Sequence, residues 1–356
     1  MNKNVCIVAG ARPNFVKVSA LIRTIRKSSG ISGILVYAGK EDDPTLEPSL
    51  FDDLQMPRPD FYLGVDSTRL NEITSRVMAE FDRFLDEHPV DVVIVVDDLA
   101  STMAAAIVTK KRGMCLAHLV AGTRSFDINM PKEINRLVID ALSDYLFTAG
   151  VKSNSIATRE QSESSQTFMV GNILMDTLRF NHNRLKKPTI EGLSESDYLV
   201  LTLNRRVLLA DKQWLRQVVE TLCKCGAKVV APLRGEAADV VSDMVAQIEH
   251  TDNFHIVAPL PYLEFGWLTA HAMGIVTDSG NVAEEATFNN VPCITLNDYT
   301  EHQETVMVGS NVLVGCDIQK LQEALGRLQR HEWKKCALPD RWDGRTSERI
   351  VQILLS

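Results

Sequence analysis

A Thr-Asp-Ser-Gly turn followed by a helical pattern is the sequence feature with the clearest chemical meaning. Residues 277–286 read TDSGNVAEEA, directly after a short apolar run. The free backbone N–H groups and the positive dipole end of a helix that starts at such a turn suit a phosphate group. We therefore expect Ser279, Gly280 and Asn281 to bind a diphosphate. The alternative is that Ser279 only caps the helix.

Charged side chains that can hold the rest of a nucleotide lie in this helix and at the first strand end. Glu284 or Glu285 can reach a ribose diol, or both can be ordinary acids of a first helical turn. Residues 10–17 read GARPNFVK between the first apolar run and the first helical pattern. Arg12 can bind phosphate through two parallel hydrogen bonds, and Lys17 follows it further along the helix. The alternative is a plain turn with a solvated arginine.

Two adjacent acids, Asp97 and Asp98, stop a buried apolar run just before another helical pattern. Acids in this position can cap the helix, or they can serve as a general base in a cleft. Both interpretations remain open from the sequence.

Two more strand ends carry polar and charged groups. A loop after the apolar run 115–120 leads into a helix and contains Arg124, Glu133 and Arg136. Asn204 and Arg205 end the first apolar run of the second half of the chain. Because the carboxyl ends of parallel strands form one edge of a sheet, we expect these groups to line a substrate pocket.

Alternation of apolar runs with amphipathic stretches sets the predicted fold. Runs that are almost continuously apolar are typical of parallel strands covered on both faces. A polar stretch without periodicity, 180–196, separates two such series and reads as an interdomain connection. The sequence therefore predicts an α/β protein of two Rossmann-like, doubly wound domains facing a cleft. The predicted strands are 5–9, 34–38, 90–96, 115–120, 145–148 and 167–170, then 198–203, 228–231, 254–257, 274–277, 293–296 and 312–314.

Composition narrows the class of partner. The 356 residues carry 38 basic and 46 acidic side chains, a formal charge of −8, which disfavours a general nucleic-acid binder. The 7 cysteines are odd in number and lack C-x-x-C spacing. There is no signal-peptide pattern and no apolar run long enough to span a membrane. We expect a cytoplasmic protein with no membrane span, no metal site and no nucleic-acid partner.

Taken together, these segments resemble the non-hydrolysing UDP-N-acetylglucosamine 2-epimerases, a family with the glycosyltransferase-B type of fold. The resemblance covers nearly the whole chain. Its segments are 10–17 (GARPNFVK), 121–136 (AGTRSFDINMPKEINR), 170–172 (VGN), 277–286 (TDSGNVAEEA), 291–296 (VPCITL), 300–306 (TEHQETV) and 343–350 (DGRTSERI).

The resemblance implies an N-terminal domain over 1–180, a UDP-binding domain over 197–335 and a C-terminal helical segment over 336–356 that packs back on the first domain. It implies a homodimer without a cofactor, acting on a UDP-N-acetylhexosamine for surface polysaccharide. The family reaction eliminates UDP to give a 2-acetamidoglucal and adds it back on the other face of C2. The residues that match its UDP contacts are Arg12, Lys17, Ser279, Gly280 and Glu285, and Asp98 matches its catalytic aspartate.

Three positions depart from the family's acid–base set. Val120 stands where the family has a glutamate, Lys132 replaces a second glutamate, and Asn204 replaces a histidine. Two hypotheses follow. Either the chain is an epimerase in which Asp98, helped by Asp97 and Glu133, moves the C2 proton, or it is a diverged paralogue. The paralogue would bind a UDP-sugar without epimerising it, as a partner, a regulator, or a glycosyl-transfer or hydrolytic variant.

Overall fold

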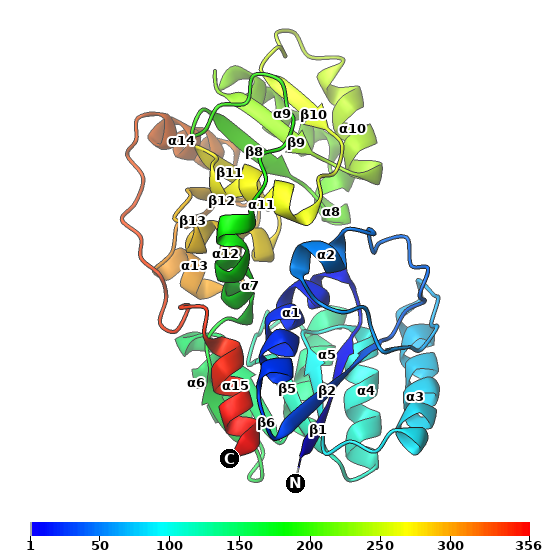
Figure 1. Cartoon of the computed structure of the whole chain (residues 1–356). Helices are drawn as coiled ribbons and strands as arrows, with labels where there is room; N and C mark the ends of the chain where they lie inside the picture. Colours follow the sequence, from blue (N-terminus) through cyan, green and yellow to red (C-terminus); the bar gives the residue numbers. More distant parts are fainter. Residues whose placement is uncertain (1) are drawn as a thin grey trace. The chain divides into compact units, whose positions relative to one another are not determined.

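The computed structural model describes residues 2–356, which divide into two compact units. Unit 1 comprises the described residues up to His182 together with Asp340–Ser356, and unit 2 comprises Asn183–Pro339. Each unit contains one parallel sheet with helices around it (Figure 1). The predicted class of two Rossmann-like α/β domains is therefore confirmed.

The sheet of unit 1 has seven parallel strands in the order β3-β2-β1-β4-β5-β6-β7. Each predicted strand of this half matches an observed one, with ends shifted by at most a few residues. The strands are β1 (Lys3–Ala9), β2 (Ile31–Tyr37), β3 (Phe61–Tyr62), β4 (Val92–Val96), β5 (Cys115–Ala121), β6 (Tyr145–Thr148) and β7 (Gln166–Met169).

The helices of unit 1 connect these strands, and the last one comes from the far end of the chain. They are α1 (Arg12–Lys27), α2 (Leu50–Leu54), α3 (Leu70–Glu87), α4 (Ala100–Lys111), α5 (Pro131–Leu142), α6 (Val151–Glu160), α7 (Ile173–Asn181) and α15 (Thr346–Leu355).

Unit 2 repeats the same plan with six parallel strands in the order β10-β9-β8-β11-β12-β13. Its strands are β8 (Tyr198–Thr202), β9 (Lys228–Pro232), β10 (Phe254–Val257), β11 (Gly274–Thr277), β12 (Cys293–Thr295) and β13 (Asn311–Leu313). Its helices are α8 (Arg206–Ala210), α9 (Lys212–Lys224), α10 (Gly235–Val245), α11 (Tyr262–Ala270), α12 (Gly280–Phe288), α13 (Gln303–Met307) and α14 (Ile318–Gln329).

The central strands are buried on both faces. Every residue of β4 (VVIVV) and of β8 (YLVLT) is buried. In unit 1, strands β1, β2 and β4 pack against α3 and α4, while unit 2 buries β8, β9 and β11 against α9 and α14. These continuous apolar strands explain why period-2 alternation is absent from the sequence.

The strand order reverses once in each sheet. Chain order runs outward from β1 on one side and from β4 on the other, and likewise from β8 and from β11 in unit 2. Loops that leave the carboxyl ends of such strand pairs diverge to opposite faces, and the gap between them is where open α/β sheets bind ligands. The loops after β1, β4, β8 and β11 carry most of the residues singled out from the sequence.

The chain leaves unit 1 through a short 3-10 helix (His182–Arg184) and returns at Asp340. Helix α15 then packs against α1 and α7 (Figure 1). The buried carboxylate of Asp176 in α7 accepts hydrogen bonds from the N–H groups of Thr346 and Ser347, at 3.0 and 2.8 Å. A side chain of α7 thus satisfies the free N–H groups at the start of α15.

Candidate active site

The turn from β1 to α1 is closed by Asn14. Its Oδ1 accepts hydrogen bonds from the N–H groups of Gly10 and Ala11, at 2.8 and 3.3 Å. Gly10 has no room for a side chain, because a Cβ there would lie 2.1 Å from a side-chain oxygen of α4. Arg12 is not a solvated side chain: its Nε donates to Oε2 of Glu47 at 2.7 Å. The guanidinium is therefore held at the strand end before any ligand arrives.

Asp97 follows β4 in the left-handed backbone region, with a φ of 59°. Its Oδ1 lies 2.6 Å from Nζ of Lys17, and its Oδ2 accepts a hydrogen bond from Nδ2 of Asn14 at 2.8 Å. Lys17 is only 5% exposed. Lys17, predicted to bind UDP, and Asp97, predicted to assist proton transfer, thus form an ion pair with each other.

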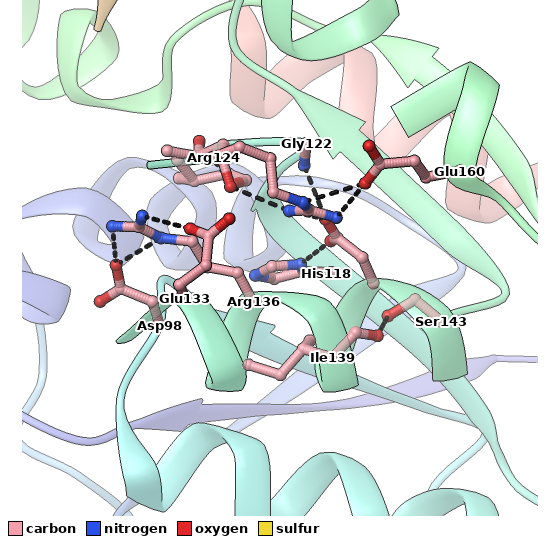
Figure 2. Close-up of polar contacts among 12 residues, drawn as sticks. Asp98, His118, Gly122, Arg124, Glu133, Arg136, Ile139, Ser143 and Glu160 are labelled. Atoms are coloured by element: carbon pink, nitrogen blue, oxygen red, sulfur yellow. Dashed lines mark hydrogen bonds and ion pairs between the residues drawn. The ribbon is translucent and has the colours of Figure 1, made fainter. Parts of the chain in front are cut away.

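Asp98 faces α5 and is held there by two cations. Its Oδ2 accepts hydrogen bonds from Nε and Nη2 of Arg136, at 2.9 and 2.6 Å (Figure 2). Its Oδ1 lies 3.4 Å from Nζ of Lys132. Burial alone would raise the pKa of Asp98, but Lys132 and Arg136 outweigh it and hold the pKa below the usual range. Asp98 is therefore a carboxylate at neutral pH, able to accept a proton but not to donate one.

Neither Asp97 nor Asp98 caps α4, so the interpretation of these acids as helix caps is wrong. The N-cap residue of α4 is Leu99, whose N–H donates to the hydroxyl of Thr102 at 3.0 Å.

Glu133 closes the loop that leads into α5. Its Oε2 accepts from the N–H and the hydroxyl of Ser125, both at 2.8 Å, and its Oε1 accepts from the N–H of Phe126 at 3.1 Å. Arg136 Nη1 adds a bond to Oε2 at 3.1 Å (Figure 2). Burial would raise the pKa of Glu133, but the Ser125 hydrogen bonds and the others outweigh it and lower the pKa. Both carboxylate oxygens are engaged in holding the loop.

A buried polar network lies beneath these acids, and sequence reasoning identified only part of it. His118 in β5 has partners on both ring nitrogens: Nδ1 lies 2.5 Å from Oδ1 of Asp140, and Nε2 lies 2.9 Å from the carbonyl oxygen of Asp97. Oδ2 of Asp140 receives the N–H of Gly122 at 3.0 Å and Nη1 of Arg124 at 2.6 Å.

Arg124 is itself drawn into this network. Its Nε and Nη2 reach Oε2 of Glu160, both at 3.0 Å, and its side chain is only 2% exposed (Figure 2). The guanidinium therefore supports the loop after β5 from within, and its predicted place in a substrate pocket stays a prediction.

Val120 has a strained backbone. It sits in β5 where the pairing with β6 shifts register between Leu119 and Ala121, and its φ is 75°. A β-branched residue at positive φ is a genuine outlier, because its Cβ crowds the backbone carbonyl. Strain of this kind persists where the surrounding structure fixes the backbone, and it is frequent at functional sites.

Replacing Val120 with glycine should stabilise the fold. We expect Val120→Gly to raise the free energy of unfolding by about 1 kcal/mol, since relief of left-handed strain exceeds the added chain entropy. Urea unfolding measures the difference. Val90→Gly is the matched control, because Val90 is also half-buried but has no positive φ. If both glycine variants are destabilised to the same degree, Val120 is not strained.

In unit 2, Asp278 ties two candidate loops together. It follows β11 directly and is 1% exposed, and its Oδ2 accepts hydrogen bonds from the N–H groups of Asn204 and Arg205 at 2.7 and 2.6 Å. Nδ2 of Asn297 donates to its carbonyl oxygen at 3.2 Å. Asn204 and Arg205 are themselves exposed. Sequence reasoning missed Asp278, because it reads there only as part of the turn before Ser279.

The predicted diphosphate turn follows directly. Ser279 caps α12, with its hydroxyl accepting the N–H of Val282 at a long 3.5 Å, so the capping interpretation is confirmed and remains compatible with a phosphate at the same turn. The two acids of α12 differ. Glu284 is buried and lies 2.7 Å from Nδ1 of His302, whereas Glu285 is half-buried. Glu285 is therefore the better candidate for a ribose contact.

The structure thus joins Asp98, Glu133 and Arg136 in one network in unit 1, with Asp97 paired to Lys17 instead. In unit 2 it places Asn204 and Arg205 beside the turn at Ser279, through their bonds to Asp278. No helix among residues 2–356 is long and apolar enough to cross a membrane. Over the same residues, no group of three or more His, Cys, Asp or Glu side chains is placed to hold a metal ion.

Comparisons with known proteins point in one direction. A family model described as UDP-N-acetylglucosamine 2-epimerase matches residues 23–355. The chain is similar to the UDP-N-acetylglucosamine 2-epimerase of Methanocaldococcus jannaschii, with 33% identity over 362 residues and 98% of each chain covered. It is also similar to the UDP-2,3-diacetamido-2,3-dideoxy-D-glucuronate 2-epimerase of Pseudomonas aeruginosa, with 30% identity over 357 residues and 98% of each chain covered.

Among solved structures, a crystal structure of the Methanocaldococcus jannaschii UDP-GlcNAc 2-epimerase in complex with UDP-GlcNAc and UDP is similar over 99% of both chains. The TM-score is 0.86 at 32% sequence identity.

Proposed function

Because the chain belongs to the UDP-N-acetylglucosamine 2-epimerase family, we propose that it binds a UDP-N-acetylhexosamine in nucleotide-sugar supply for surface polysaccharide. One observation carries this proposal: in both units most of the candidate residues lie where the strand order reverses, the place where open α/β sheets bind ligands. The similar Methanocaldococcus protein was crystallised with UDP-GlcNAc and UDP. A homodimer in the cytoplasm belongs to the same proposal.

The proposed binding of the diphosphate relies on groups whose positions the fold fixes. Gly280 begins α12 at the end of β11, so the free N–H groups of Gly280 and Asn281 and the positive end of the helix suit a diphosphate. Arg12 is held by Glu47 in a fixed orientation, which reduces the entropy lost when it binds phosphate.

The catalytic part of the family function is proton transfer at C2 of the sugar. We propose that the chain epimerises its ligand far more slowly than family members with the full acid set. Asp97 is paired with Lys17, Asp98 with Arg136, and both oxygens of Glu133 hold a loop. None of the three is arranged as a neutral acid that could return a proton to carbon.

A second candidate function is epimerisation by a reduced set. One oxygen of Asp98, Oδ1, does not contact Arg136 and lies 3.4 Å from Nζ of Lys132. A carboxylate with a lowered pKa can still accept the C2 proton, although as a weaker base. The activity measurement described in the Discussion separates the two candidates.

Nucleotide binding is tested by calorimetry with UDP. Arg12→Ala and Glu285→Ala should each weaken binding about tenfold or more, since a hydrogen bond to a charged group is worth roughly 1.5–3 kcal/mol. The matched controls are Arg83→Ala in α3 and Glu323→Ala in α14, which remove the same charges at exposed positions. Unchanged affinity in both Arg12→Ala and Glu285→Ala would remove these residues from the site.

A further inference from the structure

Unit 1 has a groove with a volume of about 620 Å³ that none of the candidate site residues lines. Its lining residues come from α1, α7 and the start of α15. These three helices pack together (Figure 1). Arg23 and Lys27 of α1 reach it, one helical turn apart. Because a helix rises 1.5 Å per residue, Arg23 lies roughly 16 Å along α1 from Arg12 at the candidate active site.

The groove is lined by cations of α1, of α7 and of the N-cap of α15: Arg23, Lys27, Arg179 and Arg345. In a chain of net charge −8, this is a local excess of positive charge. Within residues 2–356, no carboxylate forms an ion pair with Lys27, Arg179 or Arg345. The concentration of unneutralised cations on one concave surface favours an anionic ligand.

The acids in the lining do not neutralise these cations. Asp176 lies at the base of the groove, but its carboxylate is taken up by the N–H groups of Thr346 and Ser347 and by the hydroxyl of Ser347, at 2.7–3.0 Å. Glu348 is exposed on α15. Asp176 thus serves the helix start, and Lys27, Arg179 and Arg345 face one remaining acid, Glu348.

Two of the guanidinium groups are oriented in advance. Arg179 packs against Gly344, where a Cβ would lie 2.6 Å from its Cδ, and its Nη1 donates to the carbonyl oxygen of Asp343 at 2.8 Å. Arg23 lies 3.8 Å over the ring of Phe180, and its Nη1 donates to the carbonyl oxygen of Leu54. The single hydrogen bond of Arg179 leaves further N–H donors of its guanidinium for a ligand, since arginine carries five.

We propose that this groove binds a small multivalent anion of the phosphate class. Its volume lies within the roughly 300–1,000 Å³ of ordinary small-molecule sites. Arginine forks match phosphate oxygens in pairs, and lysine adds a point charge. A nucleic acid is disfavoured by the acidic charge of the chain. The site is separate from the nucleotide-binding residues and does not depend on the proposed function.

The probe is inorganic pyrophosphate, titrated into the full chain by calorimetry. The test variant combines Lys27→Gln with Arg345→Gln, two exposed side chains whose loss leaves the helix contacts intact. The matched control combines Arg83→Gln with Lys111→Gln, which removes the same charge from α3 and α4. We expect one pyrophosphate site to weaken about 100-fold in the test variant, at about tenfold per charged contact, and to be unchanged in the control.

Unfolding by urea and UDP titration show whether each variant is intact and keep this test apart from that of the nucleotide site. Arg12→Ala should leave the pyrophosphate site of the groove unchanged. Identical pyrophosphate isotherms for the unaltered chain and the test variant would overturn the proposal, and so would equal losses in test and control variants. Binding of a polyglutamate peptide without binding of pyrophosphate would also overturn it, in favour of an acidic protein partner.

Discussion

The unaltered chain is expected to convert UDP-GlcNAc into UDP-ManNAc at a rate far below that of family members with the full acid–base set, or not at all. The triple variant Val120→Glu, Lys132→Glu, Asn204→His is expected to gain this activity. Each missing acid or base typically costs about 10²- to 10⁴-fold in rate, so the difference should span several orders of magnitude.

The physical reason lies in the network around Asp98. Epimerisation through a glucal requires a proton to be removed on one face of C2 and returned on the other. Val120 carries no proton, and Asn204 cannot change its protonation at neutral pH. Lys132 and Arg136 keep the pKa of Asp98 below its usual range, which makes it a weak base and prevents it from donating. Lys132→Glu removes one of these cations and supplies an acid.

The measurement is a coupled assay for UDP-ManNAc, with NMR of the product in D₂O to detect exchange at C2. The single variant Lys132→Gln is the control, because it removes the cation without adding an acid. Robust activity of the unaltered chain would refute the prediction and establish epimerisation by the reduced set. Activity in the triple variant alone would place the defect in the missing acids.

Asp140→Ala should cost about 3–5 kcal/mol in the free energy of unfolding, because it leaves buried partners without their counter-charge. Asp140 is 5% exposed and joins His118, Arg124 and the N–H of Gly122. Urea unfolding gives the value. The matched control is Asp82→Ala, which breaks an ion pair with Arg112 at an exposed carboxylate and should cost at most about 1 kcal/mol. Similar losses in the two variants would contradict a special role for the buried network.

The same carboxylate predicts a pH dependence. Burial would raise the pKa of Asp140, but His118 and Arg124 outweigh it and lower the pKa below the ordinary value of 3.8. A lowered folded-state pKa means that the carboxylate stabilises the fold above the ordinary pKa, and that this stabilisation is lost as the pH falls through the folded-state pKa. The stability gap between the unaltered chain and Asp140→Asn should therefore be constant near neutral pH and shrink below about pH 4.

The sequence predicted both sheets and the positions of the candidate residues, because both follow from local pattern. A strand covered on both faces, such as β4, appears as a continuous apolar run, and the polar residues that end it must lie at a sheet edge. Arg12, Asp98 and Ser279 were found in this way.

The contacts between distant residues that support the candidate site have no such local pattern. His118 and Asp140 are 22 residues apart and meet only because α5 packs beside β5. The carboxylate of Asp278 binds backbone N–H groups, which carry no sequence signature. Val120 reads as an ordinary strand residue, and only the register shift beside β6 places it in the left-handed region. Tertiary packing overrides residue preference at such positions.

The return of the chain to unit 1 has a consequence for how the protein is made. Unit 2 is contiguous, from Asn183 to Pro339, whereas unit 1 is completed only by residues synthesised after it. During translation, α7 emerges 170 residues before Thr346, the donor that its buried Asp176 requires. The usual order, in which the N-terminal domain folds first on the ribosome, is thereby reversed at the last step. Unit 2 can finish folding while the α1–α7 surface is still uncovered, so in a nascent chain that surface stays exposed until α15 has been made.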